Sequence, residues 1–141
     1  MPNSLFIDTS GWASIFIPTE MHHPIAAQHF RQAIETHTAI ITTNYVITEL
    51  VALLNSPHRL PRSRIFNHIN IVRQNASITR IQIDPTLDQT AWELCQQRPD
   101  KPWSLVDCSS FVIMQQMNIQ QALTTDHHFE QAGFIRLLKP I

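Results

Sequence analysis

The chain has 141 residues, the size of one domain, and 43% of them are hydrophobic while 15% are charged, which excludes an intrinsically disordered chain. The formal net charge of −1 excludes a strongly basic molecule, so any contact with a nucleic acid has to come from a local patch. No apolar run approaches the ~18 residues that a membrane span needs, and the N-terminus lacks the basic and apolar stretches of a signal peptide.

Strand-like and helix-like segments alternate along the chain, which is typical of an α/β fold. Short apolar or β-branched runs predict strands over residues 5–7, 39–43, 78–83, 122–125 and 134–138. Apolar residues spaced by threes and fours predict helices between residues 10 and 18, over 24–36, 45–55 and 62–75, from 84 onwards, and over 104–117 and 127–132.

Local signals add detail to these helices. Asn44 is expected to cap the third helix, and Gly133 is expected to end the last one in the left-handed conformation. Phe66 and Trp92 are expected on the inner faces of the fourth and fifth helices. Two cysteines, Cys95 and Cys108, lie in helical patterns without a C-x-x-C pair, which favours reduced residues of a cytoplasmic protein.

Four acidic residues stand where strands give way to helices. Asp8 and Asp126 directly follow predicted strands, Glu49 lies one turn into the third helix, and Asp107 lies in the first turn of the sixth. In a parallel sheet all strand C-termini open on one edge, where ligands bind. We therefore expect these four carboxylates, which are far apart in the sequence, to converge in space.

Each acid also has a purely structural interpretation. Asp8 can form an Asx-turn, Asp107 can complete a capping box with Ser104, and Asp126 can cap the last helix. Glu49 is harder to explain in this way, because apolar residues cover most of its helix and burying an unpaired carboxylate is costly. Four independent caps need not share one edge of a sheet, whereas four ligands must.

The chemistry of such a cluster is that of a hard cation. Carboxylates gathered with few cations nearby are costly unless something positive binds, and oxygen-only ligands suit Mg²⁺ or Mn²⁺. A site of this kind supports metal-assisted hydrolysis of phosphodiester bonds. The eight histidines show no spacing typical of a zinc site. His127 and His128 are open to two interpretations, a contact to substrate phosphate or a solvated helix start.

Four short motifs occur in order along the chain: Phe6-Ile7-Asp8-Thr9-Ser10, Thr48-Glu49-Leu50, Trp103-Ser104-Leu105-Val106-Asp107-Cys108 and Leu123-Thr124-Thr125-Asp126-His127-His128-Phe129. With these motifs the sequence resembles the PIN-domain ribonucleases, and most closely the VapC-like toxins of bacterial toxin–antitoxin modules. The resemblance spans nearly the whole chain. It implies a single PIN-like domain over residues 1–141, a three-layer α/β/α sandwich with a central, mainly parallel sheet of four to five strands.

By this resemblance Asp8, Glu49, Asp107 and Asp126 take the four acidic catalytic and metal-binding positions, with Mg²⁺ or Mn²⁺ as the cofactor. Asp8 and Asp107 are expected to carry most of the metal binding. The resemblance implies an endoribonuclease that cuts single-stranded RNA or structured RNA loops, a cognate antitoxin that blocks the site, and a homodimer. A catalytically idle PIN-like module that binds RNA or a protein remains the alternative.

Overall fold

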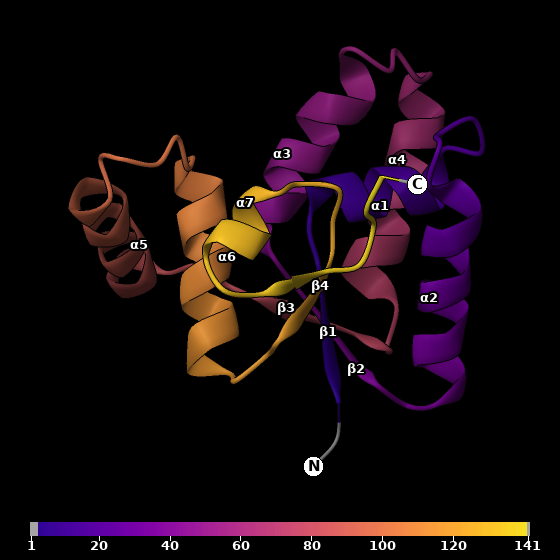
Figure 1. Cartoon of the computed structure of the whole chain (residues 1–141). Coiled ribbons are helices and arrows are strands. Elements are labelled where there is room, and N and C mark those ends of the chain that lie inside the picture. Colours follow the sequence, from indigo (N-terminus) through magenta and orange to yellow (C-terminus); the bar gives the residue numbers. More distant parts are fainter. Residues whose placement is uncertain (1–2, 141) are drawn as a thin grey trace.

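A computed structural model of the chain describes residues 3–140, and its centre is one parallel β-sheet (Figure 1). The strands are β1 (Ser4–Ile7), β2 (Ala39–Thr43), β3 (Ile78–Ile81), β4 (Gln121–Leu123) and β5 (Ile135–Arg136). They lie in the order β3-β2-β1-β4-β5, and every pair of neighbours is parallel. The predicted α/β class and the predicted, mainly parallel sheet of four to five strands are confirmed, with five strands that are all parallel.

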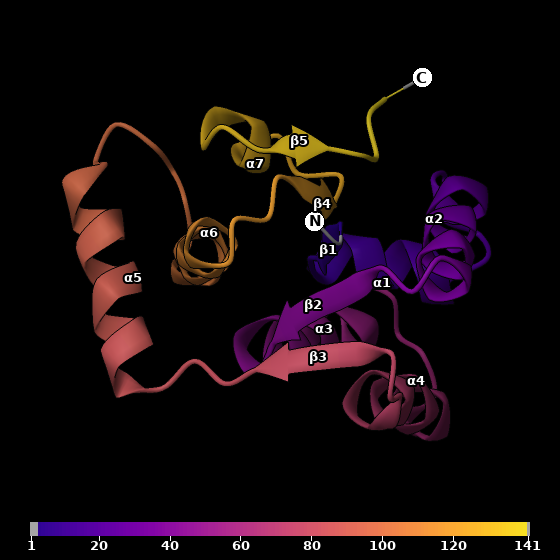
Figure 2. The same ribbon diagram turned by 90° about the horizontal axis from the view of Figure 1, so that it is seen from below.

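The helices connect these strands as crossovers. They are α1 (Thr9–Phe16), α2 (His23–Glu35), α3 (Asn44–Asn55), α4 (Arg62–Gln74), α5 (Pro85–Gln97), α6 (Leu105–Gln116) and α7 (His128–Gln131). Crossovers between parallel strands are nearly always right-handed, and because the chain reverses its direction across the sheet after β3, its later helices cover the other face. Figure 2 shows α5 and α6 on the opposite side of the sheet from α2 and α4. None of the helices in the described part of the chain combines the length and apolarity needed to cross a bilayer.

The central strands are short, apolar and covered on both faces, as parallel strands usually are. Phe6 and Ile7 of β1 and Leu123 of β4 have no exposed surface. The strand order reverses at β1, because the chain runs outwards through β2 to β3 and then returns to the other side of β1 as β4. Ligands of open α/β sheets bind beyond the strand C-termini at such a reversal.

Helix α1 lies against the backbone of β4, and Gly11 allows this approach. A Cβ atom at Gly11 would be 2.0 Å from the carbonyl oxygen of Leu123. The N–H of Asp8 donates to the same carbonyl at 3.2 Å. Because Gly11 has no side chain, Asp8, the residue that follows β1, can lie close to the end of β4.

We expect Gly11→Ala to destabilise the fold by about 3 kcal/mol or more, the upper end of overpacking, because backbone atoms cannot move aside for the new methyl group. Gly133→Ala is the matched control. Nothing lies within 4 Å of a Cβ there, and its φ of +96° leaves only a conformational cost of roughly 1–2 kcal/mol. Urea unfolding of both variants measures their free energies of unfolding, and Gly11→Ala should lose more. Equal losses of stability in the two variants would contradict the close contact of Gly11 with Leu123.

The prediction that Phe66 and Trp92 lie on the inner faces of their helices is wrong. Phe66 is 51% exposed and Trp92 is 48% exposed. Helices α4 and α5 bury narrower stripes than the spacing of their apolar residues indicated, and Ala91 is the residue of α5 that is fully buried. The guanidinium of Arg62 stacks over the Phe66 ring, 5.0 Å from its centroid, so the exposed ring takes part in a cation–π contact.

Caps and boundaries follow the sequence in part. Gly133 has the predicted positive φ. The side chain of Thr43, rather than Asn44, caps α3 by accepting from the N–H of Val46. Asn44 instead accepts from the N–H of Ile83 at 2.7 Å, so its side chain holds the chain just after β3, which ends two residues earlier than predicted.

Candidate metal-dependent active site

The four predicted acids line one cavity of about 530 Å³ at the C-terminal edge of the sheet. Asp8 directly follows β1, and Asp126 lies in the turn between β4 and α7. Glu49 comes from the second turn of α3, and Asp107 from the first turn of α6. The expected convergence of the four carboxylates is therefore what the structure shows, and the cavity lies at the reversal of strand order.

Asp8 is the most deeply placed of the four, with 4% of its surface exposed. Its Oδ2 accepts from the hydroxyl of Thr124 at 3.1 Å, whereas its Oδ1 is buried and has no hydrogen-bond partner among the described residues. Burial raises the pKa of this carboxyl to about 7, with further repulsion from Asp107 and Glu49, and the backbone N–H of Thr9 offsets part of the rise. A buried polar atom without a hydrogen-bond partner is rare in proteins and needs an explanation, which a bound cation would provide.

Glu49 is half-buried and faces the same cavity. The hydroxyl of Thr9 donates to its Oε1, so the residue after Asp8 orients the carboxylate of a distant helix. Burial raises the pKa of Glu49, as does repulsion from Asp107 and Asp126, while the hydrogen bond from Thr9 lowers it. The prediction that Glu49 faces a cleft rather than bulk solvent is confirmed.

Asp107 has the structural role that the sequence offered and a place in the site as well. Its backbone N–H donates to the Ser104 hydroxyl at 3.0 Å, and its Oδ2 accepts from the backbone N–H of Ser104 at 3.1 Å, which completes the capping box of α6. His128 Nδ1 lies 3.0 Å from the same oxygen. Both contacts use Oδ2, and no hydrogen bond to Oδ1 occurs among the described residues. Burial raises the pKa of Asp107 despite these hydrogen bonds.

Thr124, which the sequence did not single out, connects the two acids that follow neighbouring strands. Its single hydroxyl hydrogen goes to Asp8, so it accepts from the hydroxyl of Ser10 at 3.1 Å and from the backbone N–H of Asp126 at 3.0 Å. Ser10 in turn accepts from the backbone N–H of Thr125. This network holds the ends of β1 and β4 in one arrangement.

His128 was open to two interpretations, and the structure places it inside the acid cluster. Its Nδ1 lies 3.0 Å from Asp107 and 3.3 Å from Asp126 Oδ1, and its side chain is 18% exposed against 63% for His127. Because carboxylates only accept, Nδ1 carries the hydrogen. Asp126 also accepts from the backbone N–H of His128, two residues on, as in an Asx-turn. Helix α7 begins one residue later than predicted, so His127 rather than Asp126 is at its N-cap position.

Asp126, His127 and His128 each offer one possible metal-ligand atom, a carboxylate oxygen or a ring nitrogen, and these three atoms lie within 4.8 Å of one another. Within residues 3–140 no three of the four acids form a group as tight as this one.

The lining of the cavity fits a hard divalent cation. Neither lysine nor arginine is among the residues that line it in the described part of the chain. Ionised, the four carboxylates repel one another, and a bound cation is the compensation that such a group needs. Their oxygens are the ligands preferred by Mg²⁺ and Mn²⁺, and the free oxygens of Asp8 and Asp107 are available without breaking a hydrogen bond.

Comparison with known sequences agrees with this geometry. The family model described as PIN domain matches residues 5–135. The "23S rRNA-specific endonuclease VapC20" of two Mycobacterium tuberculosis strains is 28% identical over 133 residues, which are 94% of this chain and 97% of VapC20.

Solved structures agree as well. The crystal structure of M. tuberculosis VapC20, described as a Sarcin-Ricin loop cleaving toxin, superposes with a TM-score of 0.80 at 26% identity, covering 94% of this chain and 97% of that one. PAE2754 from Pyrobaculum aerophilum superposes with a TM-score of 0.66 at 18% identity, covering 97% and 91%, and supports the fold alone. The sequence motifs, the parallel sheet and the family match over residues 5–135 lead to one conclusion: the chain belongs to the PIN-domain family.

Proposed function

We propose that this chain is a metal-dependent endoribonuclease that hydrolyses phosphodiester bonds of RNA. The observation that carries the proposal is the convergence of Asp8, Glu49, Asp107 and Asp126 on one cavity, with a buried oxygen of Asp8 left without a partner. VapC20 is named for a ribosomal RNA substrate and covers nearly the whole chain. By analogy we propose single-stranded RNA or an RNA loop as the substrate.

Each acid has a role in this proposal. Asp8 and Asp107 are the main metal ligands, because both line the cavity and each keeps one carboxylate oxygen outside the hydrogen bonds described above. Glu49, held by Thr9, and Asp126 complete the cluster and orient the attacking water as hydrogen-bond acceptors. A bound Mg²⁺ or Mn²⁺ would polarise the phosphoryl oxygen, acidify water and stabilise the leaving oxygen.

Metal removal tests the proposal. Purified protein is expected to cut a single-stranded RNA with Mn²⁺ present and to lose cleavage completely with excess chelator, since the bare carboxylates repel the phosphate backbone. Calorimetry with Mn²⁺ should show binding heat that Asp107→Asn largely removes. An idle PIN-like module would show neither cleavage nor carboxylate-dependent heat. Cleavage that persists in chelator would contradict the assignment.

His128 offers a second test, because it holds two of the proposed ligands. His128→Ala is expected to weaken Mn²⁺ binding by about 10-fold. This is the lower end of the usual cost of losing a residue that hydrogen-bonds to a metal ligand. His128→Asn keeps a donor near the position of Nδ1 and should recover part of the affinity. His29→Ala is the control, since that histidine lines a separate cavity that shares no residue with the acid cavity. Equal Mn²⁺ affinity of His128→Ala and the parent would exclude a positioning role.

We further propose the toxin role of a toxin–antitoxin pair in the cytoplasm, with a cognate antitoxin and a homodimer as assemblies. The VapC-like motifs and the similarity to VapC20 support this. Phe66, Trp92 and Ile135 are at least 48% exposed and offer apolar surface to protein partners. Cys95 and Cys108 are free cysteines, which suits a reducing compartment.

A further inference from the structure

A second cavity opens beside the carboxylate cavity. It measures about 330 Å³ and shares three wall residues with it: Ser10, Leu53 and Thr125. Its outer walls come from the loop after α1, with Glu20 and Met21, and from the loop after α3, with His58. The two cavities are therefore neighbours, and the outer one continues the lining of the site from Ser10 and Thr125 to these two loops.

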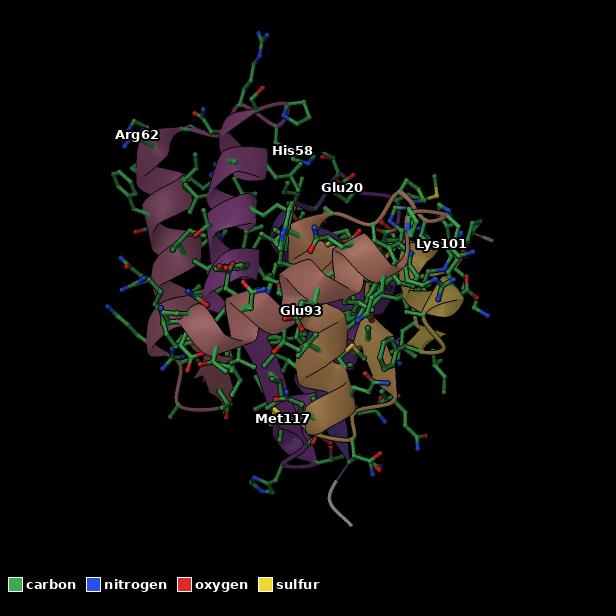
Figure 3. All side chains as sticks on the ribbon, turned by 90° about the vertical axis from the view of Figure 1, so that its left-hand side faces the viewer. Glu20, His58, Arg62, Glu93, Lys101 and Met117 are labelled. Carbon is green, nitrogen blue, oxygen red and sulfur yellow. The ribbon has the colours of Figure 1, made fainter. Side chains whose placement is uncertain are left out.

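A side-chain contact between His58 and Glu20 connects the two loops at the outer cavity. His58 Nε2 lies 3.4 Å from Glu20 Oε1, and the two side chains are 24% and 37% exposed. Figure 3 shows the two residues side by side, well separated from Lys101. The contact uses one carboxylate oxygen, so Oε2 of Glu20 stays free to accept. Met21 beside them is 73% exposed.

The lining decides which part of an RNA strand suits this outer cavity. No lysine or arginine lines it among the described residues, and Glu20 repels a phosphate. A nucleobase is neutral, and single-stranded bases can be splayed out, stacked and read by hydrogen bonds along their edges. Met21 supplies an adaptable apolar contact for a base face, and Glu20, held in place by His58, supplies a fixed acceptor.

We propose that the outer cavity binds the base of a nucleotide next to the scissile phosphate, and that Glu20 accepts a hydrogen bond from the exocyclic amino group of that base. The inference rests on the proposed ribonuclease function and adds a specificity-determining residue to it. Adenine, cytosine and guanine carry such a group, whereas uracil presents carbonyl oxygens in its place. The cavity volume is within the range of about 300–1,000 Å³ usual for small-ligand pockets.

The test uses single-stranded RNA oligonucleotides with one cleavage site, in which the nucleotides on the 5′ and 3′ sides of the cut bond are varied in turn. With Mn²⁺, the parent is expected to prefer amino-bearing bases over uracil on one side by roughly 10-fold in kcat/KM, as one good base contact allows. Glu20→Ala should remove this preference while leaving cleavage beside uracil nearly unchanged. Met21→Ala should raise KM for all four bases alike.

Matched controls come from the same molecule. Glu93→Ala and Met117→Ala change an exposed glutamate and an exposed methionine that lie away from Glu20 in Figure 3, and both should keep the parent's preference. His58→Ala keeps the Glu20 acceptor and should retain part of the preference, which separates base recognition from loss of the loop contact.

The outcomes separate the two proposals. Equal base ratios for the parent and Glu20→Ala at both positions, with RNA still cut, would overturn the base site and leave the nuclease assignment standing. A parent that cuts no RNA with Mn²⁺, and so behaves like Asp8→Asn, would overturn the nuclease assignment and the base site with it.

Discussion

Asp8→Asn is expected to reduce RNA cleavage by at least about 100-fold. Losing a residue that only hydrogen-bonds to a metal ligand usually costs about 10–100-fold, and losing a ligand itself should cost more. The substitution is isosteric and keeps an oxygen able to accept from Thr124, so the fold should persist. The changed property is the negative charge on the oxygen that has no partner within the described residues. Cleavage rates with Mn²⁺ and circular dichroism of both proteins check the two halves of this expectation.

Asp84→Asn is the matched control for this experiment. Asp84 also follows a strand, β3, but it caps α5 by accepting from the N–H of Leu87 and is not among the residues that line the acid cavity. Asparagine caps helices as well as aspartate does, so activity and stability should stay close to the parent. Equal cleavage by Asp8→Asn and the parent would show that the metal site lies elsewhere.

The metal-free protein is expected to lose stability as the pH rises from about 4 to above 7. Burial raises the pKa of Asp8 from 3.8 to about 7, so the folded state holds a proton that the unfolded state has released. The stabilising effect is present below the ordinary pKa and is lost as the pH passes the raised one. The change in pKa corresponds to a total of about 4 kcal/mol, and Glu49 and Asp107 shift in the same direction.

Urea unfolding in chelator between about pH 4 and pH 8 measures this loss. Comparison with Asp8→Asn isolates Asp8, since asparagine does not titrate, and the two free energies of unfolding should diverge as the pH rises. At the alkaline end the metal-free variant is expected to be the more stable protein. Saturating Mn²⁺ should restore the parent and have little effect on the variant. Parallel stability curves in chelator would contradict the burial of an unpaired Asp8 carboxylate.

Local features of the site could be predicted because they depend on neighbours in the sequence. The capping box of Ser104 and Asp107 and the left-handed Gly133 follow from residue types at fixed short spacings. The acids Asp8 and Asp126 could be placed at the sheet edge because each follows a short apolar run. The caps of α3 and α7 were less certain, since several polar residues stand together there and each can take the role.

Contacts between distant segments could not be predicted in the same way. Phe66 and Trp92 have helix-face spacing, but whether a face is covered depends on where neighbouring elements lie. Thr124 and His128 belong to the site through a hydroxyl bonded to Asp8, 116 residues away, and a ring turned towards Asp107. No periodicity in the sequence encodes either orientation.

The sequence by itself determined the alternation of strands and helices, because apolar patterning and turn chemistry act over a few residues, and its four short motifs carried the resemblance to the PIN-domain family. Only the tertiary structure decided which carboxylate oxygen lacks a partner among the described residues, that His128 contacts two acids, and that a neighbouring cavity is lined by Glu20. These features depend on the packing of crossovers around the reversal at β1, where residues far apart in the chain become neighbours.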